Sequence, residues 1–162
     1  MEAESSRRVF DGKLIKVDVE RWPSGEREVM KHPGACAVVA ITAEGEVLLV
    51  KQFREAVRQE LLEIPAGIIE EGESAEECAA RELLEETGYR ATKLQHLGSI
   101  YTSPGFTNER IELFRAEPER VGDPTEEAVD VVTIPIIRAI EAADRGDIVD
   151  LKTLAALLLV RG

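Results

Sequence analysis

The stretch "GIIEEGESAEECAARELLEETGY" at residues 67–89 decides the fold of this chain. Eight of its 23 residues are glutamates, and the segment from Ser74 to Thr87 has the pattern of one helix. Ser74 is placed to cap this helix, with Glu77 three residues later, and Gly88 is placed to end it. Like charges three and four residues apart destabilise a helix by roughly 0.2–0.5 kcal/mol per pair, so the glutamates need a compensating interaction.

Helical spacing separates these residues into two faces. Apolar residues recur every four positions from Ala75 to Leu83 and predict a stripe against the core. Glu82, Glu85 and Glu86 lie at i, i+3 and i+4, which predicts three carboxylates on one common face. Converging carboxylates repel one another unless a cation lies between them, and ligation by oxygen alone favours Mg²⁺, with Mn²⁺ as a substitute, over zinc.

The alternative for any single glutamate is a solvated acidic face, and Glu71, Glu76 and Glu77 fit that reading. Arg81 lies four residues after Glu77 and four before Glu85, so it is expected to bridge these two and orient the cluster. For the three converging carboxylates taken together, a divalent metal site is the preferred interpretation.

Composition narrows the function classes. With 162 residues, of which 44% are apolar, the chain is expected to bury a core, and its net charge of −12 argues against nucleic acids and anionic membranes as partners. The first ten residues have no apolar h-region and the longest apolar runs are too short to cross a bilayer. Cys36 and Cys78 are expected to be small buried hydrophobes in a reducing compartment, which predicts a cytoplasmic location.

Strands and short helices are predicted around the acidic helix. Alternation at 13–22, a turn at 23–26 and residues 27–32 predict an N-terminal hairpin. Apolar runs at 34–42 and 46–53 predict strands buried on both faces, and residues 60–69 a strand broken by Pro65 and Gly67. Further strands are expected at 93–102, 110–117 and 128–135, and helices near 136–144 and 151–160. This order predicts an α/β fold, an α/β/α sandwich around a mixed β-sheet with an N-terminal antiparallel sheet.

The opening stretch resembles the Nudix box, G-x5-E-x7-R-E-U-x-E-E-x-G-U, in which U is a bulky aliphatic residue. Every fixed residue of this signature is present. The last position, where a bulky aliphatic residue is usual, is Tyr89 in this chain. The matching residues are Gly67, Glu73, Arg81, Glu82, Leu83, Glu85, Glu86 and Gly88. Nudix enzymes hydrolyse nucleoside diphosphates linked to another group and use a divalent metal ion, so the resemblance implies the Nudix fold and a pyrophosphohydrolase.

The resemblance also implies roles for single residues. The implied metal ligands are Glu82, Glu85, Glu86 and the carbonyl oxygen of Ala66. Gly67, Glu73 and Arg81 are implied to hold the helix and its ligands in place.

Stretches outside the box resemble the bacterial ADP-ribose pyrophosphatases: "REVMKHPGACAVVAI", "VKQFREAV", "LEIPAGIIEEGE" and "YTSPGFTNE". Pro104 lies fifteen residues after Tyr89, where that family has a proline. The implied reaction is Mg²⁺-dependent hydrolysis of ADP-ribose to AMP and ribose 5-phosphate by attack of water on phosphorus. A bound metal ion would let a protein this acidic accept an anionic substrate.

Substrate contacts are implied by the same resemblance. Arg54 is the candidate for binding the pyrophosphate, with a surface arginine as the alternative. Arg27 and Glu28 match positions that contact the adenosine end, with an ordinary exposed strand pair as the alternative. Glu109 is implied to reach the terminal ribose or a metal ion, and Pro104 belongs to the same substrate-binding set.

A base must deprotonate the attacking water. The family places a glutamate on a mobile loop near the C-terminal part of the sheet, where this chain has Glu126 and Glu127. The strand that follows favours Glu127, the choice between the two stays open, and Glu85 is assigned to catalysis as well as to metal binding. A solvated acidic turn is the alternative for this loop.

Two other functions remain open. One is hydrolysis of another sugar nucleotide, such as GDP-mannose, and the other is a non-catalytic nucleotide sensor, against which the intact box argues.

The resemblance implies a homodimer in which residues 1–34 are an N-terminal β-strand region exchanged between subunits and residues 35–162 are the Nudix hydrolase domain. Neither nucleic acid nor membrane is an expected partner.

Overall fold

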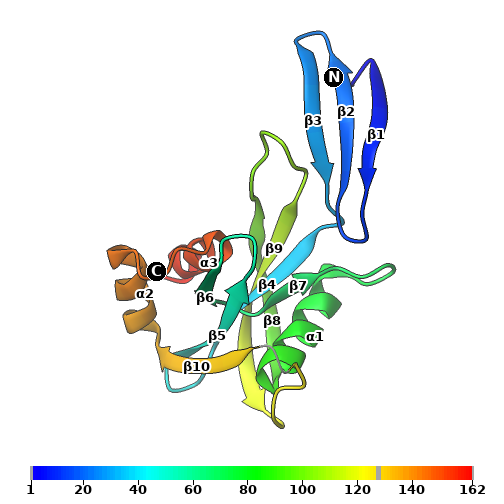
Figure 1. Cartoon of the computed structure of the whole chain (residues 1–162). Coiled ribbons are helices and arrows are strands. Elements are labelled where there is room, and N and C mark those ends of the chain that lie inside the picture. The colour runs from blue at the N-terminus through cyan, green and yellow to red at the C-terminus, as the bar shows by residue number, and fades with distance from the viewer. Residues whose placement is uncertain (1, 127–128, 162) are drawn as a thin grey trace.

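A computed structural model of the chain describes residues 2–126 and 129–161. A small antiparallel sheet comes first (Figure 1), made of β1 (Ser5–Asp11), β2 (Lys16–Trp22) and β3 (Gly25–Lys31). The larger sheet contains β4 (Ala35–Ile41), β5 (Glu46–Arg54), β6 (Gln59–Glu63), β7 (Ala66–Ile68), β8 (Tyr89–Tyr101), β9 (Arg110–Arg120) and β10 (Asp130–Pro135). The helices are α1 (Ala75–Thr87), α2 (Ile136–Arg145) and α3 (Leu151–Val160).

The larger sheet is mixed, as the sequence predicts. Its main order is β10-β5-β4-β9-β8, and β6 and β7 extend it by pairing with β5 and β4. The β4–β9 pair is parallel, whereas the other pairs are antiparallel. The central strand β4 therefore sets the positions of both β7 and the segments that meet at its ends.

Alternate residues of β4 divide the core into two halves. Ala37 and Val39 pack in the cluster that contains residues of α2 and α3, while Val38 and Ala40 pack in the cluster that contains Leu83 of α1. These four strand residues are fully buried, so β4 is covered on both faces. The layers α1, sheet, and α2 with α3 confirm the predicted α/β/α sandwich.

Helix α1 begins and ends as the sequence predicts. The Ser74 hydroxyl accepts a hydrogen bond from the Glu77 N–H at 3.2 Å, and the Glu77 carboxylate accepts one from the Ser74 N–H at 2.9 Å. Gly88 ends the helix in the left-handed region with φ of 73°, and its N–H reaches the Leu84 carbonyl. Capping of this kind fixes where the glutamates of α1 lie along the sheet.

Strands β1, β7 and β8 differ from the sequence-based expectation. Strand β1 was not expected, because its exposed residues show no alternating apolar pattern. Gly67 lies inside β7, so the break in this region falls before Ala66. Strand β8 begins at Tyr89, four residues earlier than expected, and two register shifts along it interrupt the alternation that reveals a strand.

The N-terminal sheet extends away from the larger sheet (Figure 1). Its buried side chains are charged: Asp18 pairs with Arg8, and Glu20 pairs with Lys31 at 2.6 Å. The Met30 N–H donates to the Phe106 carbonyl at 2.7 Å, which ties the end of β3 to the loop before β9. Among the described helices, none is both long and apolar enough to cross a membrane.

Candidate active site

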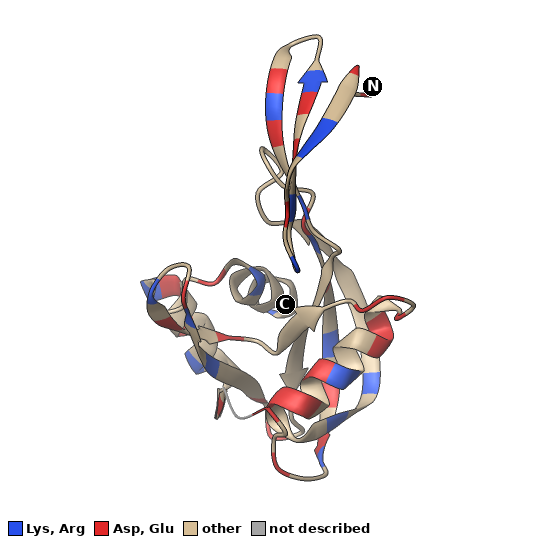
Figure 2. Cartoon of the chain, turned by 45° about the vertical axis from the view of Figure 1, so that its right-hand side comes forward, with Lys and Arg blue, Asp and Glu red and all other residues tan. Residues whose placement is uncertain are grey.

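Three carboxylates gather at the face of α1 that meets the sheet. Glu82 and Glu86, one helical turn apart, are 8% and 3% exposed, and Glu126 joins them from the loop before β10. One oxygen from each of these three residues lies within 4.8 Å of the others. Figure 2 shows the acidic residues along α1 in red. We call these three residues the carboxylate cluster.

Backbone hydrogen bonds bring Glu126 to the helix. The N–H groups of Thr125 and Glu126 donate to the Glu85 carbonyl at 2.9 and 3.1 Å. Carbonyl groups in the last turn of a helix have no partner within the helix, so this one is available to the loop. The end of α1 thus holds a residue forty positions later in the chain beside Glu86.

Strand β7 packs directly against the carboxylate cluster. The Ala66 N–H donates to Glu86 Oε2 at 3.0 Å. At Gly67, a Cβ atom would lie 1.8 Å from Glu82 Oε1, so only glycine leaves room for that carboxylate. The short strand therefore fixes the position of both buried glutamates.

Burial makes the cluster electrostatically unfavourable without a cation. The pKa of Glu86 is raised to about 8, first by burial and then by the charges of Glu126 and Glu82, which together outweigh the hydrogen bond from the Ala66 N–H and the charge of Arg54. The pKa of Glu82 is also raised, first by burial and then by Glu85 and Glu126. An oxygen-only donor set of this charge fits a hard divalent cation such as Mg²⁺ or Mn²⁺, which would offset the repulsion.

Arg81 links the cluster to the loop before α1. Its Nε donates to Glu73 Oε1 at 2.8 Å, and its Nη1 donates to Glu82 at 2.7 Å and to Glu85 at 3.1 Å. Hydrogen bonding to Arg81 lowers the pKa of Glu73 to about 2. The expected bridge from Arg81 to Glu77 is wrong, because the Glu77 carboxylate is taken up by the cap at Ser74.

Glu85 does not converge with its two neighbours as the helical spacing suggested. Its side chain is 45% exposed and pairs with Arg81, while Glu126 completes the carboxylate cluster. Each residue turns the helix by about 100°, so Glu85 projects to the flank of α1 while Glu86 projects to the sheet. Within the described residues, the group with cation-binding spacing contains Glu126 and not Glu85.

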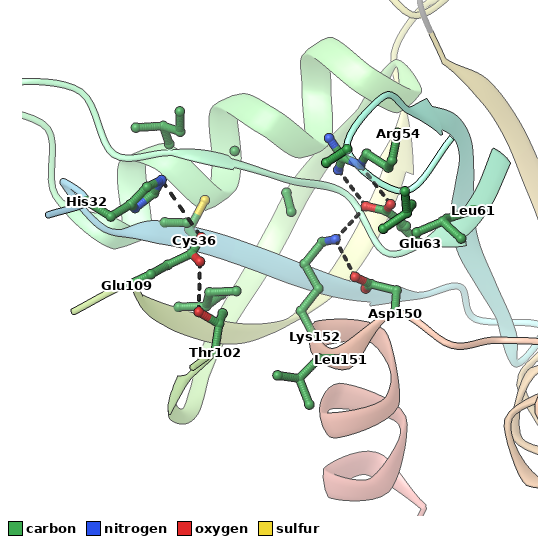
Figure 3. Close-up of a pocket in the computed structure, with 17 residues that line it drawn as sticks. His32, Cys36, Arg54, Leu61, Glu63, Thr102, Glu109, Asp150, Leu151 and Lys152 are labelled. Carbon is green, nitrogen blue, oxygen red and sulfur yellow. Dashed lines mark hydrogen bonds and ion pairs between the residues drawn. The ribbon is translucent and has the colours of Figure 1, made fainter. Parts of the chain in front are cut away.

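A cleft of about 600 Å³ lies beside the cluster, and Ala66 and Gly67 form part of its wall (Figure 3). Its polar lining comprises His32, Arg54, Glu63, Thr102, Glu109, Asp150 and Lys152. Figure 3 shows His32 and Glu109 at one end and Arg54, Glu63 and Lys152 at the other. Clefts of this volume are typical of small-molecule sites.

Some of the residues predicted to bind substrate line this cleft and others do not. Arg54 and Glu109 are in its wall, and Glu109 accepts a hydrogen bond from the Thr102 hydroxyl at 2.8 Å. Pro104 is exposed in the loop before β9 and is not part of the lining. Arg27 and Glu28 lie on β3 in the projecting sheet, outside the cleft of their own chain. Glu127 lies outside the described residues.

Two buried charged residues of the cleft could not be identified from the sequence analysis. Glu63 is 1% exposed and Lys152 is 8% exposed, and the two form an ion pair. Burial acts to raise the pKa of Glu63, but the hydrogen bonds and charges of Arg54 and Lys152 outweigh it and lower that pKa. The available signal was Lys152, the one charged residue of the helix "LKTLAALLLV", because a buried ammonium requires an anionic partner.

Comparisons with known proteins agree on one family. The model of the NUDIX domain matches residues 30–156. The ADP-ribose pyrophosphatase of Bacillus subtilis is 40% identical over 94% of this chain and 88% of its own length. The GDP-mannose pyrophosphatase of Cronobacter sakazakii is 34% identical over 85% of this chain and 79% of its own length. A crystal structure of an ADP compounds hydrolase superposes with a TM-score of 0.80 at 23% identity, covering 99% of this chain and 91% of that one, which shows the shared fold.

Proposed function

The chain belongs to the Nudix family, and from this premise we propose that it hydrolyses the pyrophosphate of ADP-ribose to AMP and ribose 5-phosphate. The observation that carries the proposal is the carboxylate cluster beside a cleft that contains Arg54. The similarity to an ADP-ribose pyrophosphatase over nearly the whole chain supports this substrate.

The residues of α1 and β7 have defined tasks in this proposal. Glu82, Glu86 and the carbonyl oxygen of Ala66 hold Mg²⁺, or Mn²⁺ in its place, together with Glu85 or Glu126. When bound, the metal ion neutralises the pyrophosphate and lowers the pKa of the nucleophilic water. Glu73 keeps Arg81 in place through two hydrogen bonds of 2.8 and 3.1 Å, and Arg81 in turn holds Glu82.

In this proposal Arg54 contacts the pyrophosphate from the wall of the cleft. Its side chain is 39% exposed, and the hydrogen bonds to Glu63 raise the pKa of Arg54 and so favour its charged form. A planar guanidinium suits bidentate contact with phosphate oxygens. Glu109 lies at the other end of the cleft and serves the terminal ribose or a metal ion (Figure 3).

The base is one of the two glutamates in the loop before β10. Glu126 belongs to the carboxylate cluster, which supports a role near the metal and the water. Glu127 remains the other candidate. Replacing the base by glutamine should abolish the acidic limb of the kcat–pH profile, because the group whose ionisation activates the water is then absent. Replacing the other glutamate should leave that limb in place.

We further propose a cytoplasmic homodimer that exchanges the N-terminal sheet. The buried residues of that sheet are charged, whereas its apolar residues Val9 and Phe10 are 45% and 53% exposed and therefore available for contact with a partner subunit. In such a dimer Arg27 and Glu28 would reach the adenosine end of the partner's site. A protein that is a monomer by light scattering and is fully active in the assay would contradict this part of the proposal.

The substrate is tested by a panel of ADP-ribose, GDP-mannose, a diadenosine polyphosphate and 8-oxo-dGTP, with Mg²⁺. We expect the highest kcat/KM for ADP-ribose. GDP-mannose is the principal competitor, because a pyrophosphatase for it is similar to this chain. A higher kcat/KM for GDP-mannose would overturn the substrate and leave the reaction type standing. Binding of ADP-ribose without turnover of any compound would indicate a nucleotide sensor instead.

A further inference from the structure

Arg54, Glu63 and Lys152 form one ion-paired chain along the wall of the cleft (Figure 3). Arg54 donates from Nε to one oxygen of Glu63 at 2.8 Å and from Nη2 to the other at 2.5 Å. The Lys152 ammonium donates to the same carboxylate. The side chains are 39%, 1% and 10% exposed in the order Arg54, Glu63, Lys152, so Arg54 is the exposed member and its two partners are buried.

The side-on geometry of the pair leaves part of Arg54 available to a ligand. Nε and Nη2 form the fork that binds Glu63, and no described residue accepts a hydrogen bond from Nη1. A guanidinium is planar, so two bonds to one carboxylate fix both its position and its plane. Glu63 therefore sets the direction in which the N–H groups of Nη1 point.

Helix α3 in turn fixes Glu63. The Lys152 ammonium also contacts Asp150 at 3.0 Å, and Asp150 caps α3 by accepting from the Thr153 N–H at 3.0 Å. The Thr153 hydroxyl accepts a hydrogen bond from the Ile64 N–H at 2.9 Å, directly beside Glu63. The first turn of α3 is thus bonded to both the backbone and the carboxylate at the end of β6.

Lys152 also has an electrostatic task. It gives the buried Glu63 carboxylate a second cationic partner, which compensates the cost of burying that charge. Asp150 pairs with Lys152 in turn, so the four groups are neutral together.

We propose that Lys152 and Glu63 are positioning residues for Arg54, holding its free guanidinium edge toward the pyrophosphate of the substrate. This inference rests on the proposed function, in which Arg54 contacts the pyrophosphate. The competing explanation is an ion pair that only fastens α3 to β6, which would affect stability without acting through Arg54.

A double-mutant cycle separates these explanations. We expect Lys152→Met to lower kcat/KM for ADP-ribose by about 10- to 100-fold, the range that a displaced positioning group produces. If Lys152 acts through Arg54, adding Lys152→Met to Arg54→Ala should lower kcat/KM no further. Losses that multiply in the double variant would overturn the proposal.

The matched control is Lys51→Met. Lys51 pairs with Glu60 at 2.6 Å on the same two strands, β5 and β6, but both side chains are about half exposed and lie outside the cleft. We expect kcat/KM of this variant to equal that of the wild type. Lys152→Arg should retain most of the activity, since it keeps the charge; a loss as large as that of Lys152→Met would overturn the proposal.

A further variant guards against loss of folding. Glu63→Leu combined with Lys152→Met removes both buried charges together, and replacing a buried pair by apolar residues is commonly tolerated. We expect this protein to remain folded and to lose activity as Arg54→Ala does, because Arg54 has lost its support. The Mg²⁺ concentration for half-maximal activity should stay unchanged; a clear rise would place the defect at β7 and overturn the proposal.

Binding of inorganic pyrophosphate with Mg²⁺, measured by calorimetry on the same variants, distinguishes this proposal from the proposed function. A wild-type protein that binds pyrophosphate with the same non-additive cycle, yet hydrolyses no ADP-ribose, would retain the positioning role and refute the substrate. Hydrolysis of ADP-ribose with multiplicative losses would refute the positioning role alone. A wild-type protein that neither hydrolyses ADP-ribose nor binds pyrophosphate would refute both proposals.

Discussion

Single atoms decide whether the carboxylate cluster can form. At Gly67 the nearest oxygen of Glu82 lies 1.8 Å from where a Cβ would stand. We predict that Gly67→Ala displaces this carboxylate and raises the Mg²⁺ concentration for half-maximal activity at least about tenfold, comparable to the loss of a residue that orients a ligand. Gly122→Ala is the control, because nothing lies within 4 Å of its added methyl group. Equal Mg²⁺ dependence of the two variants would contradict the role of this close contact.

The buried carboxyl of Glu86 should make stability depend on pH when metal is removed. Burial raises its pKa to about 8 in the folded protein, against about 4.3 for an unfolded chain. Between these values the folded state retains a proton that the unfolded state has released, so the free energy of unfolding falls as the pH rises from about 5 to 8. Glu73, with a pKa of about 2, acts in the opposite direction and only at lower pH.

Glu86→Gln tests this pH dependence. We predict that the variant loses less stability than the wild type between pH 5 and pH 8, by about 1 kcal/mol or more, since one pKa unit corresponds to roughly 1.4 kcal/mol. The glutamine oxygen can still accept from the Ala66 N–H. Urea unfolding in EDTA across this range provides the measurement. Parallel profiles for the two proteins would show that Glu86 is not protonated in the folded state.

Helix α1 owes its position to its two ends, and these ends contribute differently. Ser74→Ala removes the capping box and should cost about 1 kcal/mol of stability. Gly88→Ala should cost more, because φ is 73° and the added Cβ would lie 2.4 Å from the Gly122 carbonyl oxygen. Urea unfolding of both variants gives the comparison, and a smaller loss for Gly88→Ala would contradict the left-handed cap as the tighter constraint.

Features encoded locally could be read from the sequence, and features created by packing could not. The ends of α1 were predictable because Ser74 and Gly88 act within one turn of the chain. Helical spacing predicted Glu85 beside Glu82 and Glu86 and could not reveal Glu126, because it says nothing about a loop forty residues later that docks beside Glu86. Similarly, Glu63 and Lys152 lie 89 residues apart and meet only once α3 covers the sheet.

At the scale of the whole molecule, the N-terminal sheet is the element that the folded monomer explains least. Its strands carry alternating charges (Figure 2), and Arg27 forms hydrogen bonds only to its neighbours Ser24 and Glu26 among the described residues. In an exchanged dimer, this sheet would pack against the partner subunit and Arg27 would reach the partner's substrate site.

Mixing two inactive variants tests the exchange. Arg27→Ala and Glu86→Gln should each be impaired, and a dimer with one subunit of each contains one site with both residues intact if Arg27 serves its partner. We predict that dissociating and reassociating an equal mixture restores about a quarter of the wild-type activity, the share of intact sites in a random mixture of dimers. No recovery would indicate that Arg27 acts within its own chain or not at all.

The proposed reaction is tested by quantifying the products formed from ADP-ribose with Mg²⁺ by the wild type and by Glu86→Gln. We predict equal amounts of AMP and ribose 5-phosphate from the wild type, none without a divalent metal ion, and a loss of at least about 100-fold in the variant, which lacks the carboxylate proposed to bind the metal. Wild-type products other than these two, or full activity of Glu86→Gln, would contradict it.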